Sequence, residues 1–155
     1  LTSCPNIRAE GFIDLATFCT GLEDLRLDNC PGVNDDLFHA IAKNNHVIHT
    51  LLATESWDDG YGKLGQWKIT QVTDEGIEAV LLARKDAIKK IALPEGTTDR
   101  SIQLVVEHCP SVSCLELFSS LITNEGCQVL MQLRQIKKLL IGEDSKGNFP
   151  SSPSN

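Results

Sequence analysis

Apolar residues recur along the chain in a short phrase whose members are spaced by three residues and then by two. The phrase occurs five times, and its copies begin 26, 40, 24 and 24 residues apart. Because its last two apolar positions are separated by a single residue, each copy predicts a short strand with one buried face. The apolar positions are Leu22, Leu25 and Leu27; Ile48, Leu51 and Ala53; Ile88, Ile91 and Leu93; Val112, Leu115 and Leu117; and Ile136, Leu139 and Ile141.

A second phrase lies between the strand phrases and predicts the start of a helix. In four of the five copies the second residue has a side-chain oxygen; acidic residues follow, and apolar residues then recur at helical spacing. The side-chain oxygen can accept a hydrogen bond from a free amide of the first helical turn, and the acids complement the helix dipole. The copies span residues 7–12, 33–38, 72–77, 97–102 and 122–127, and the expected caps are Asn34, Thr73, Thr98 and Thr123.

The two phrases together form a unit of about 25 residues, which is typical of leucine-rich repeats. One unit cannot bury its own apolar face, so neighbouring units must stack to share a core. We therefore predict an α/β fold: a leucine-rich repeat solenoid of about five repeats, with short parallel strands on the concave side and helices on the convex side. The predicted repeat domain spans residues 1–142. Residues 143–155, rich in serine and proline, are predicted to be a tail or linker.

The clearest unit runs from Cys19 to Ala42 and carries a further pattern. Cys19 and Cys109 precede the first apolar strand position by three residues, whereas Cys4 and Cys30 fit a position three residues after the last one. In this the chain resembles the cysteine-containing leucine-rich repeat family, which includes F-box substrate receptors with a ribonuclease-inhibitor-like solenoid. The resemblance covers roughly residues 1–142 and implies protein binding, including substrate recruitment for a ubiquitin ligase. Other residues fill the second cysteine position in later units: Ser56, Gly96, Ser120 and Asp144.

Composition narrows the kinds of partner. The 155 residues are 41% hydrophobic, enough for one domain with a sizeable core. A net charge of −7 disfavours nucleic acid and acidic membrane surfaces as partners, and the chain has no apolar run long enough for membrane insertion. The chain begins within the second half of a unit, so we expect it to be part of a longer chain or a complex.

The six cysteines are predicted to be reduced and structural. Most of them occupy repeat columns that should be buried, which favours an intracellular location, cytoplasmic or nuclear, with a mitochondrial location as the alternative. Cys114 differs, because its strand position should face the concave side, where a thiol can be reactive. No metal site, cofactor or catalytic constellation is predicted, since His46 and His49 lack further ligands at suitable spacing. The column cysteines are Cys4, Cys19, Cys30, Cys109 and Cys127.

One interval between units is longer than the others by about 14 residues. The extra segment, approximately residues 54–68, contains both tryptophans and the only tyrosine of the chain. Tryptophan and tyrosine are enriched among the residues that dominate interfaces, and insertions into such repeats often lie on the binding side. We therefore predict that Trp57, Tyr61 and Trp67 bind a partner; the alternative is that they pack the loop against its own repeat.

The strand positions between the core residues predict the composition of the concave face. This face should be acidic at its first strand and basic at its third and fifth, with apolar residues where solvent is expected. Such a surface suits a protein partner of opposite charge polarity, although solvated lysines are the simpler explanation. The residues predicted to contact a partner are Arg26, Asp28, Leu52, Lys90, Glu116, Phe118 and Lys138.

The sequence thus predicts a non-catalytic scaffold that binds another protein through its concave face and aromatic loop. A part of a ubiquitin ligase that recognises substrates is one form of this role. The alternative is a structural or assembly subunit of a larger, mitochondrial complex, whose neighbours cover both open ends. A secreted ligand-sensing receptor is a weaker hypothesis, since secreted repeats normally have disulfide-capped ends.

Overall fold

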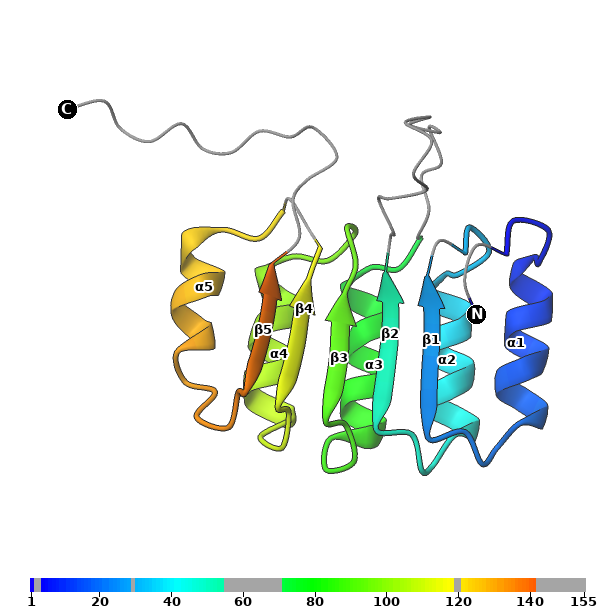
Figure 1. Ribbon diagram of the computed structural model, residues 1–155, viewed down its shortest axis with the longest axis horizontal. Helices are drawn as coiled ribbons and strands as arrows, with labels where there is room; N and C mark the ends of the chain where they lie inside the picture. The colour runs from blue at the N-terminus through cyan, green and yellow to red at the C-terminus, as the bar shows by residue number, and fades with distance from the viewer. Residues whose placement is uncertain (2–3, 29, 55–70, 119–120, 142–155) are drawn as a thin grey trace.

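The computed structural model describes residue 1 and residues 4–28, 30–54, 71–118 and 121–141. In this part of the chain, a single sheet of five parallel strands in chain order alternates with five helices (Figure 1). The strands are β1 (Asp24–Asp28), β2 (Thr50–Thr54), β3 (Lys90–Leu93), β4 (Cys114–Leu117) and β5 (Lys138–Ile141). The helices are α1 (Ala9–Phe18), α2 (Asp35–Asn44), α3 (Asp74–Arg84), α4 (Asp99–His108) and α5 (Asn124–Leu130).

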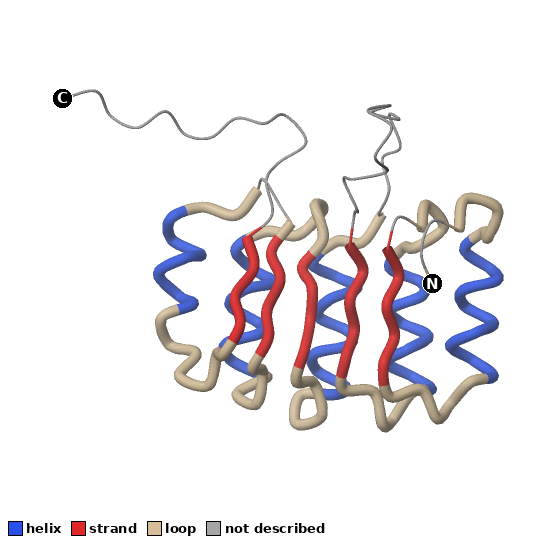
Figure 2. Tube along the Cα trace, in the orientation of Figure 1, coloured by secondary structure: helices blue, strands red, loops and turns tan. Residues whose placement is uncertain are grey.

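The predicted strand phrases coincide with the five strands, and the register aligns their apolar positions. Leu25 pairs with Leu51, Leu51 with Ile91, and Leu115 with Leu139. The helices cover one face of the sheet, and each contacts the next along the chain (Figure 2). The aligned rows and the helix stripes together form one hydrophobic core. An α/β repeat-like arrangement is therefore confirmed.

The predicted helix caps are also confirmed. Asn34 accepts a hydrogen bond from the Leu37 amide, and each of the three threonines accepts one from the amide two residues further on, all at 3.2 Å. Each bond satisfies one of the free amides of a first helical turn. The first helix differs, because Arg8 precedes it and makes no side-chain cap.

The aspartate that follows each of the first three caps has a second role, which is to join neighbouring units. The Asp35 carboxylate, at the start of α2, accepts hydrogen bonds from the amide and the hydroxyl of Thr73, at 2.8 and 2.7 Å. Asp74 accepts the equivalent pair from Thr98, at 2.9 and 2.6 Å, and Asp99 the pair from Thr123 at the start of α5. We call this series the Asp–Thr ladder. It fixes the start of one helix against the start of the next.

The ladder explains which residue can stand at the third position of each helix. A Cβ atom at Gly76 would lie 2.3 Å from Oδ1 of Asp35, and one at Gly126 would lie 2.1 Å from Oδ1 of Asp99. In α2 the same position holds Leu37, which is fully buried. The preceding unit has Ala9 in place of the aspartate, so no carboxylate occupies that space. A ladder carboxylate thus faces a small residue in the following unit: glycine in α3 and α5, and in α4 Ser101, whose hydroxyl donates to Asp74 at 2.5 Å.

Two side chains join the units at the opposite ends of the helices. Asn45, which follows α2, is fully buried, and its amide donates to the Cys19 carbonyl at 2.8 Å. Arg84, from α3, donates to the carbonyls of Asn45 and Ala42. These carbonyls belong to the end of α2, where a cation is favourable because of the helix dipole.

The burial of the cysteines differs in part from the prediction. No disulfide is formed by the six cysteines. Cys30 and Cys109 are buried as expected, and burial raises the pKa of Cys109 to about 12. Cys19 and Cys127, however, are exposed, so the prediction was wrong for them. Cys19 ends the first helix and Cys127 lies on the last, where one side lacks a neighbouring unit in the described part of the chain.

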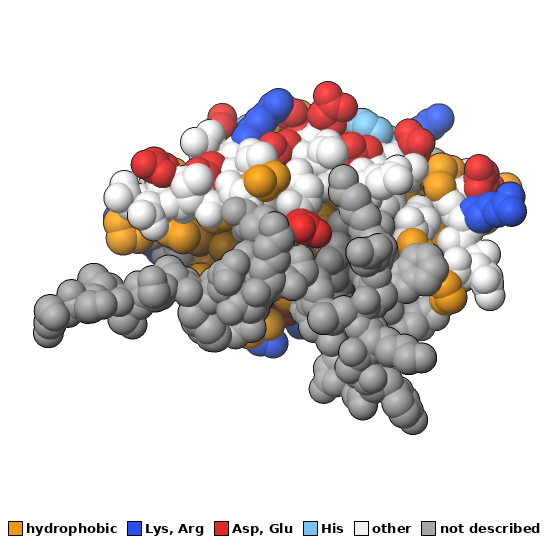
Figure 3. Space-filling model, turned by 90° about the horizontal axis from the view of Figure 1, so that it is seen from above, with side chains coloured by type: hydrophobic (Ala, Val, Ile, Leu, Met, Phe, Trp, Pro, Cys, Tyr) orange, Lys and Arg blue, Asp and Glu red, His pale blue; other side chains and the backbone are white. Residues whose placement is uncertain are grey.

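The two edges of the sheet differ in how far they are covered. At β1, the terminal ammonium of Leu1 donates to the Arg26 carbonyl at 2.8 Å, and the Asp28 amide donates to the Leu1 carbonyl. At β5, the core-facing Leu139 and Ile141 are 42% and 66% exposed, whereas Leu115 and Leu117 of β4 are buried. Figure 3, seen from above, shows hydrophobic side chains at the α5 end on the left. The core is therefore uncovered beyond the last unit described.

We predict that the Asp–Thr ladder makes stability depend on pH. Burial raises the pKa of Asp74, but hydrogen bonds from Ser101 and Thr98 outweigh it, so the pKa is lowered overall. The contribution of Asp74 is thus present above the ordinary carboxyl pKa of about 3.9 and lost as the pH falls through the lower folded-state pKa. Asp74→Asn should reduce the free energy of unfolding at pH 7 by about 1–3 kcal/mol, and by less at pH 2.

Urea unfolding at both pH values measures this difference. The matched control is Asp14→Asn, an exposed position on α1, where we expect a change within about 0.5 kcal/mol. Equal losses for Asp74→Asn at pH 7 and pH 2 would contradict a role for the ionised carboxylate.

Candidate functional site

The sheet face opposite the helices, here called the open face, displays the strand residues that lie between the core positions. Side chains alternate between the two faces of a strand, so parallel register aligns the outward positions in rows across the sheet. One row runs from Asp24 through Thr50, Lys90 and Cys114 to Lys138. The rows place residues that are far apart in the sequence next to one another.

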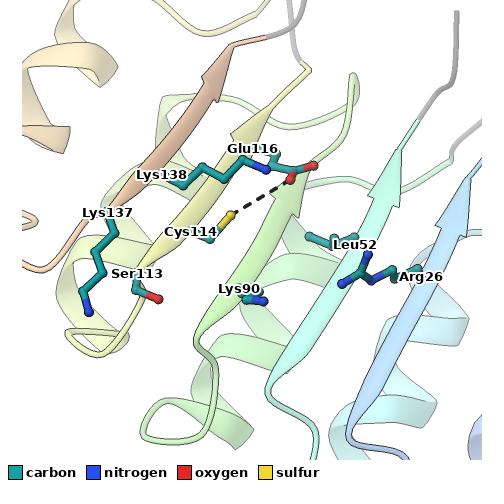
Figure 4. A pocket seen from close by; sticks show the side chains of 8 residues that line it. All are labelled: Arg26, Leu52, Lys90, Ser113, Cys114, Glu116, Lys137 and Lys138. Carbon is teal, nitrogen blue, oxygen red and sulfur yellow. Dashed lines mark hydrogen bonds between the residues drawn. The ribbon is translucent and has the colours of Figure 1, made fainter.

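A shallow hollow of about 260 Å³ lies on the open face. Figure 4 shows that side chains from all five strands contribute to it, together with Ser113 and Lys137, which directly precede β4 and β5. Four lining residues are cationic and one is a carboxylate, so the hollow is electropositive although the chain has a net charge of −7. The lining residues are Arg26, Leu52, Lys90, Ser113, Cys114, Glu116, Lys137 and Lys138.

The β1 side of the open face is acidic. His49 lies 3.5 Å from a carboxylate oxygen of Glu23 and 4.0 Å from one of Asp24. A hydrogen bond from Thr50 and the charge of the nearby His49 hold the pKa of Asp24 below its ordinary value. Two carboxylates and a histidine therefore lie close together at the end where β1 and β2 begin.

The structure brings together five of the ten predicted binding residues. These five line the hollow: Arg26, Leu52, Lys90, Glu116 and Lys138. Asp28 and Phe118 are half-buried at the far ends of β1 and β4 and do not line it. The three predicted aromatic residues of the insertion, Trp57, Tyr61 and Trp67, lie outside the described residues, as do residues 143–155.

Leu52 is a correction to the predicted open face. We expected an apolar side chain exposed to solvent, but Leu52 is only 8% exposed. It lies in the floor of the hollow, and the longer Arg26 and Lys90 line the same hollow around it. A leucine in this position supplies apolar surface at the base of a charged rim, and is not an independent contact site.

Ser113, Cys114 and Lys137 complete the lining but were not among the predicted binding residues. The Cys114 thiol lies 4.0 Å from a carboxylate oxygen of Glu116, and Cys114 is 7% exposed. The small Ser113 and Cys114 stand between bulkier residues of β3 and β5, which leaves room for the hollow. The strand register could have indicated Ser113 and Lys137, because each directly precedes a strand and the two residues are aligned with each other across β4 and β5.

No group of three or more histidine, cysteine or acidic side chains in the described residues is arranged to hold a metal ion. Among the same residues, no helix combines the length and the apolar character that crossing a membrane requires. The open face presents an electropositive hollow with the largely buried Leu52 among its lining residues.

Comparison with known proteins adds no family to this description. The chain matches no model of a protein family, and none of the curated proteins matches it. The resemblance to cysteine-containing leucine-rich repeats thus remains a prediction from Cys4, Cys19, Cys30 and Cys109 and from the repeat spacing.

Proposed function

We propose that this chain is a leucine-rich repeat solenoid that acts as a non-catalytic scaffold, and that its open face binds another protein. The stacked units support the solenoid: five parallel strands follow one another in chain order, with the helices on one face. The regular spacing of the units is the same feature that predicted it from the sequence. The role includes substrate recognition for an intracellular ubiquitin ligase, which the cysteine pattern suggests.

The single observation that carries the binding role is the hollow on the open face. It combines charged residues at the rim with Leu52 in the floor. Interfaces commonly pair a buried apolar centre with a polar rim, and arginine is enriched among residues that dominate binding energy. Arg26 on β1 and Glu116 on β4 lie on opposite sides of Leu52, so a partner that contacts both must cover the hollow.

We predict that Arg26→Ala combined with Glu116→Ala weakens capture of a cellular partner at least about tenfold, since interface truncations of this kind cost about 1–3 kcal/mol. The immobilised chain is incubated with cell lysate, and bound proteins are quantified by mass spectrometry. The matched control is Arg100→Ala with Glu78→Ala, a pair that forms an ion pair between α4 and α3 on the helix side. It removes the same residue types and leaves the net charge unchanged.

If the two double variants have equal melting temperatures, weaker capture of a partner reflects the loss of a binding contact and not a loss of folding. A partner retained by the control and lost by the open-face variant supports the proposal. If both variants capture the same proteins as the unaltered chain, the open face is not the binding surface.

A second candidate function is a structural subunit of a larger assembly, mitochondrial or otherwise. The uncovered end of the sheet favours it. All of β5 is exposed, and Met131, which follows α5, is 79% exposed. An exposed apolar sheet edge is a template for association, so a neighbouring subunit that continues the stack would bury it.

If this second role holds, the isolated chain should self-associate as its concentration rises. Size-exclusion chromatography with light scattering from about 5 to 200 µM measures this, a range in which weak apolar contacts of this kind are expected to appear. Ile141→Lys with Met131→Lys should restore the monomer, because both charges would be desolvated on association. A chain that stays monomeric throughout the range would contradict the assembly role.

A further inference from the structure

Two lysine residues on the open face flank a small residue in one row. Lys90 on β3 pairs in register with Cys114 on β4, and Cys114 pairs with Lys138 on β5. Neighbouring strands lie about 4.8 Å apart, so the backbones that carry the two lysines are separated by about 10 Å. Both lysines are exposed and line the hollow between them.

The row before it repeats the arrangement. The Ser113 amide donates to the Lys89 carbonyl at 2.9 Å, and the Lys137 amide donates to the Ser113 carbonyl at 2.8 Å. Lys89 and Lys137 thus flank Ser113 as Lys90 and Lys138 flank Cys114. Three of these lysines, Lys90, Lys137 and Lys138, line the hollow, and Lys89 directly precedes Lys90 at the start of β3.

Folding alone does not account for these four charges. None of them forms an ion pair with a carboxylate of the described residues, and like charges gathered on one sheet destabilise it. Lysine on an edge strand can prevent sheets from associating, which would explain Lys137 and Lys138. It does not explain Lys89 and Lys90, because β3 lies in the middle of the sheet.

We propose that this half of the open face, here called the lysine quartet (Lys89, Lys90, Lys137 and Lys138), binds an extended acidic peptide segment of a partner protein. The inference rests on the proposed function, because it names the chemistry that the same face would recognise. Glutamate or aspartate side chains would neutralise the quartet, and the intervening residue would lie over the hollow. An extended chain rises about 3.3 Å per residue, so acids two residues apart share one face of the peptide and lie about 6.6 Å apart, within reach of two long lysine side chains on backbones about 10 Å apart.

A peptide fits this surface better than a larger polyanion. The hollow is small, at about 260 Å³, and Glu23 and Asp24 lie on the same open face. Viewed from the end where the helices begin, carboxylates also spread along the helix side of the molecule (Figure 3). A nucleic acid or an anionic membrane would meet all of these charges, whereas a short acidic segment over the quartet would face Glu116 of the hollow but not Glu23, Asp24 or the carboxylates of the helix side.

The test uses a fluorescein-labelled peptide of twelve residues in which Glu and Ser alternate, and fluorescence anisotropy at low salt. The Glu peptide should bind, and the same peptide with Gln in place of Glu should not. Lys90→Gln with Lys138→Gln should weaken binding about tenfold, because two charge contacts are lost. The matched control is Lys43→Gln with Lys85→Gln, at the ends of α2 and α3. It makes the same change in net charge and should alter affinity less than about twofold.

Three results would overturn the proposal. The first is an equal loss of affinity in the two double variants, which would mean that only net charge matters. The second is binding of a single-stranded oligonucleotide, or of phosphatidylserine vesicles, that is as tight as binding of the Glu peptide. The third is a partner that depends on Arg26 and Glu116 but keeps its affinity when Lys90 and Lys138 are changed. In that case the acidic-peptide inference fails while the proposed binding function stands.

Discussion

The hydrogen bonds from one helix start to the next are the constraint on which this architecture depends. A parallel sheet of short strands leaves each unit with a marginal interface to its neighbour, and stability accumulates unit by unit. The ladder aspartates Asp35, Asp74 and Asp99 each accept two bonds from a threonine one unit further on. That threonine also caps its own helix, so one side chain serves both the helix start and the contact between units. A shift of one unit against the next would break the two ladder bonds, whereas the cap lies within its own unit.

The open face follows from this arrangement. Because the register is fixed, Lys90, Cys114 and Lys138 stand in one row, and the hollow forms where small residues separate long ones. The helices bury one side of the sheet, and the opposite side presents side chains from every strand on one surface. Charge is separated between the two sides: carboxylates are concentrated at the helix starts, where they act structurally, and lysines are concentrated on the open face. An acidic chain thereby presents a basic surface.

Much of the fold could be predicted from the sequence, because the repeat shows strand and helix starts in every unit. Leu25, Leu51, Ile91 and Leu115 are core residues as the two-residue alternation indicates. The role of Asp74 toward Thr98 could not be predicted from one unit, since an acid after a helix cap already has a sufficient local explanation in the dipole. The exposure of Cys19 and Cys127 was missed for a related reason: a repeat column predicts burial only where a neighbouring unit is present. The hollow depends on the relative size of aligned side chains such as Cys114, which the pattern of apolar residues does not include.

The central claim is that the ladder carboxylate dictates the residue in the next unit, and a double-mutant cycle between Asp35 and Gly76 tests it most directly. Gly76→Ala alone should destabilise the chain by about 1–3 kcal/mol, because the new methyl group meets the Asp35 carboxylate. In the Asp35→Ala background the same change should be neutral or stabilising, since alanine is favoured over glycine within a helix by about 1 kcal/mol. Gly11→Ala, at the equivalent position of α1, is the control, where the new methyl group would meet only the Ile7 side chain. If Gly76→Ala costs the same free energy of unfolding in both backgrounds, the Asp35 carboxylate does not dictate the residue at position 76.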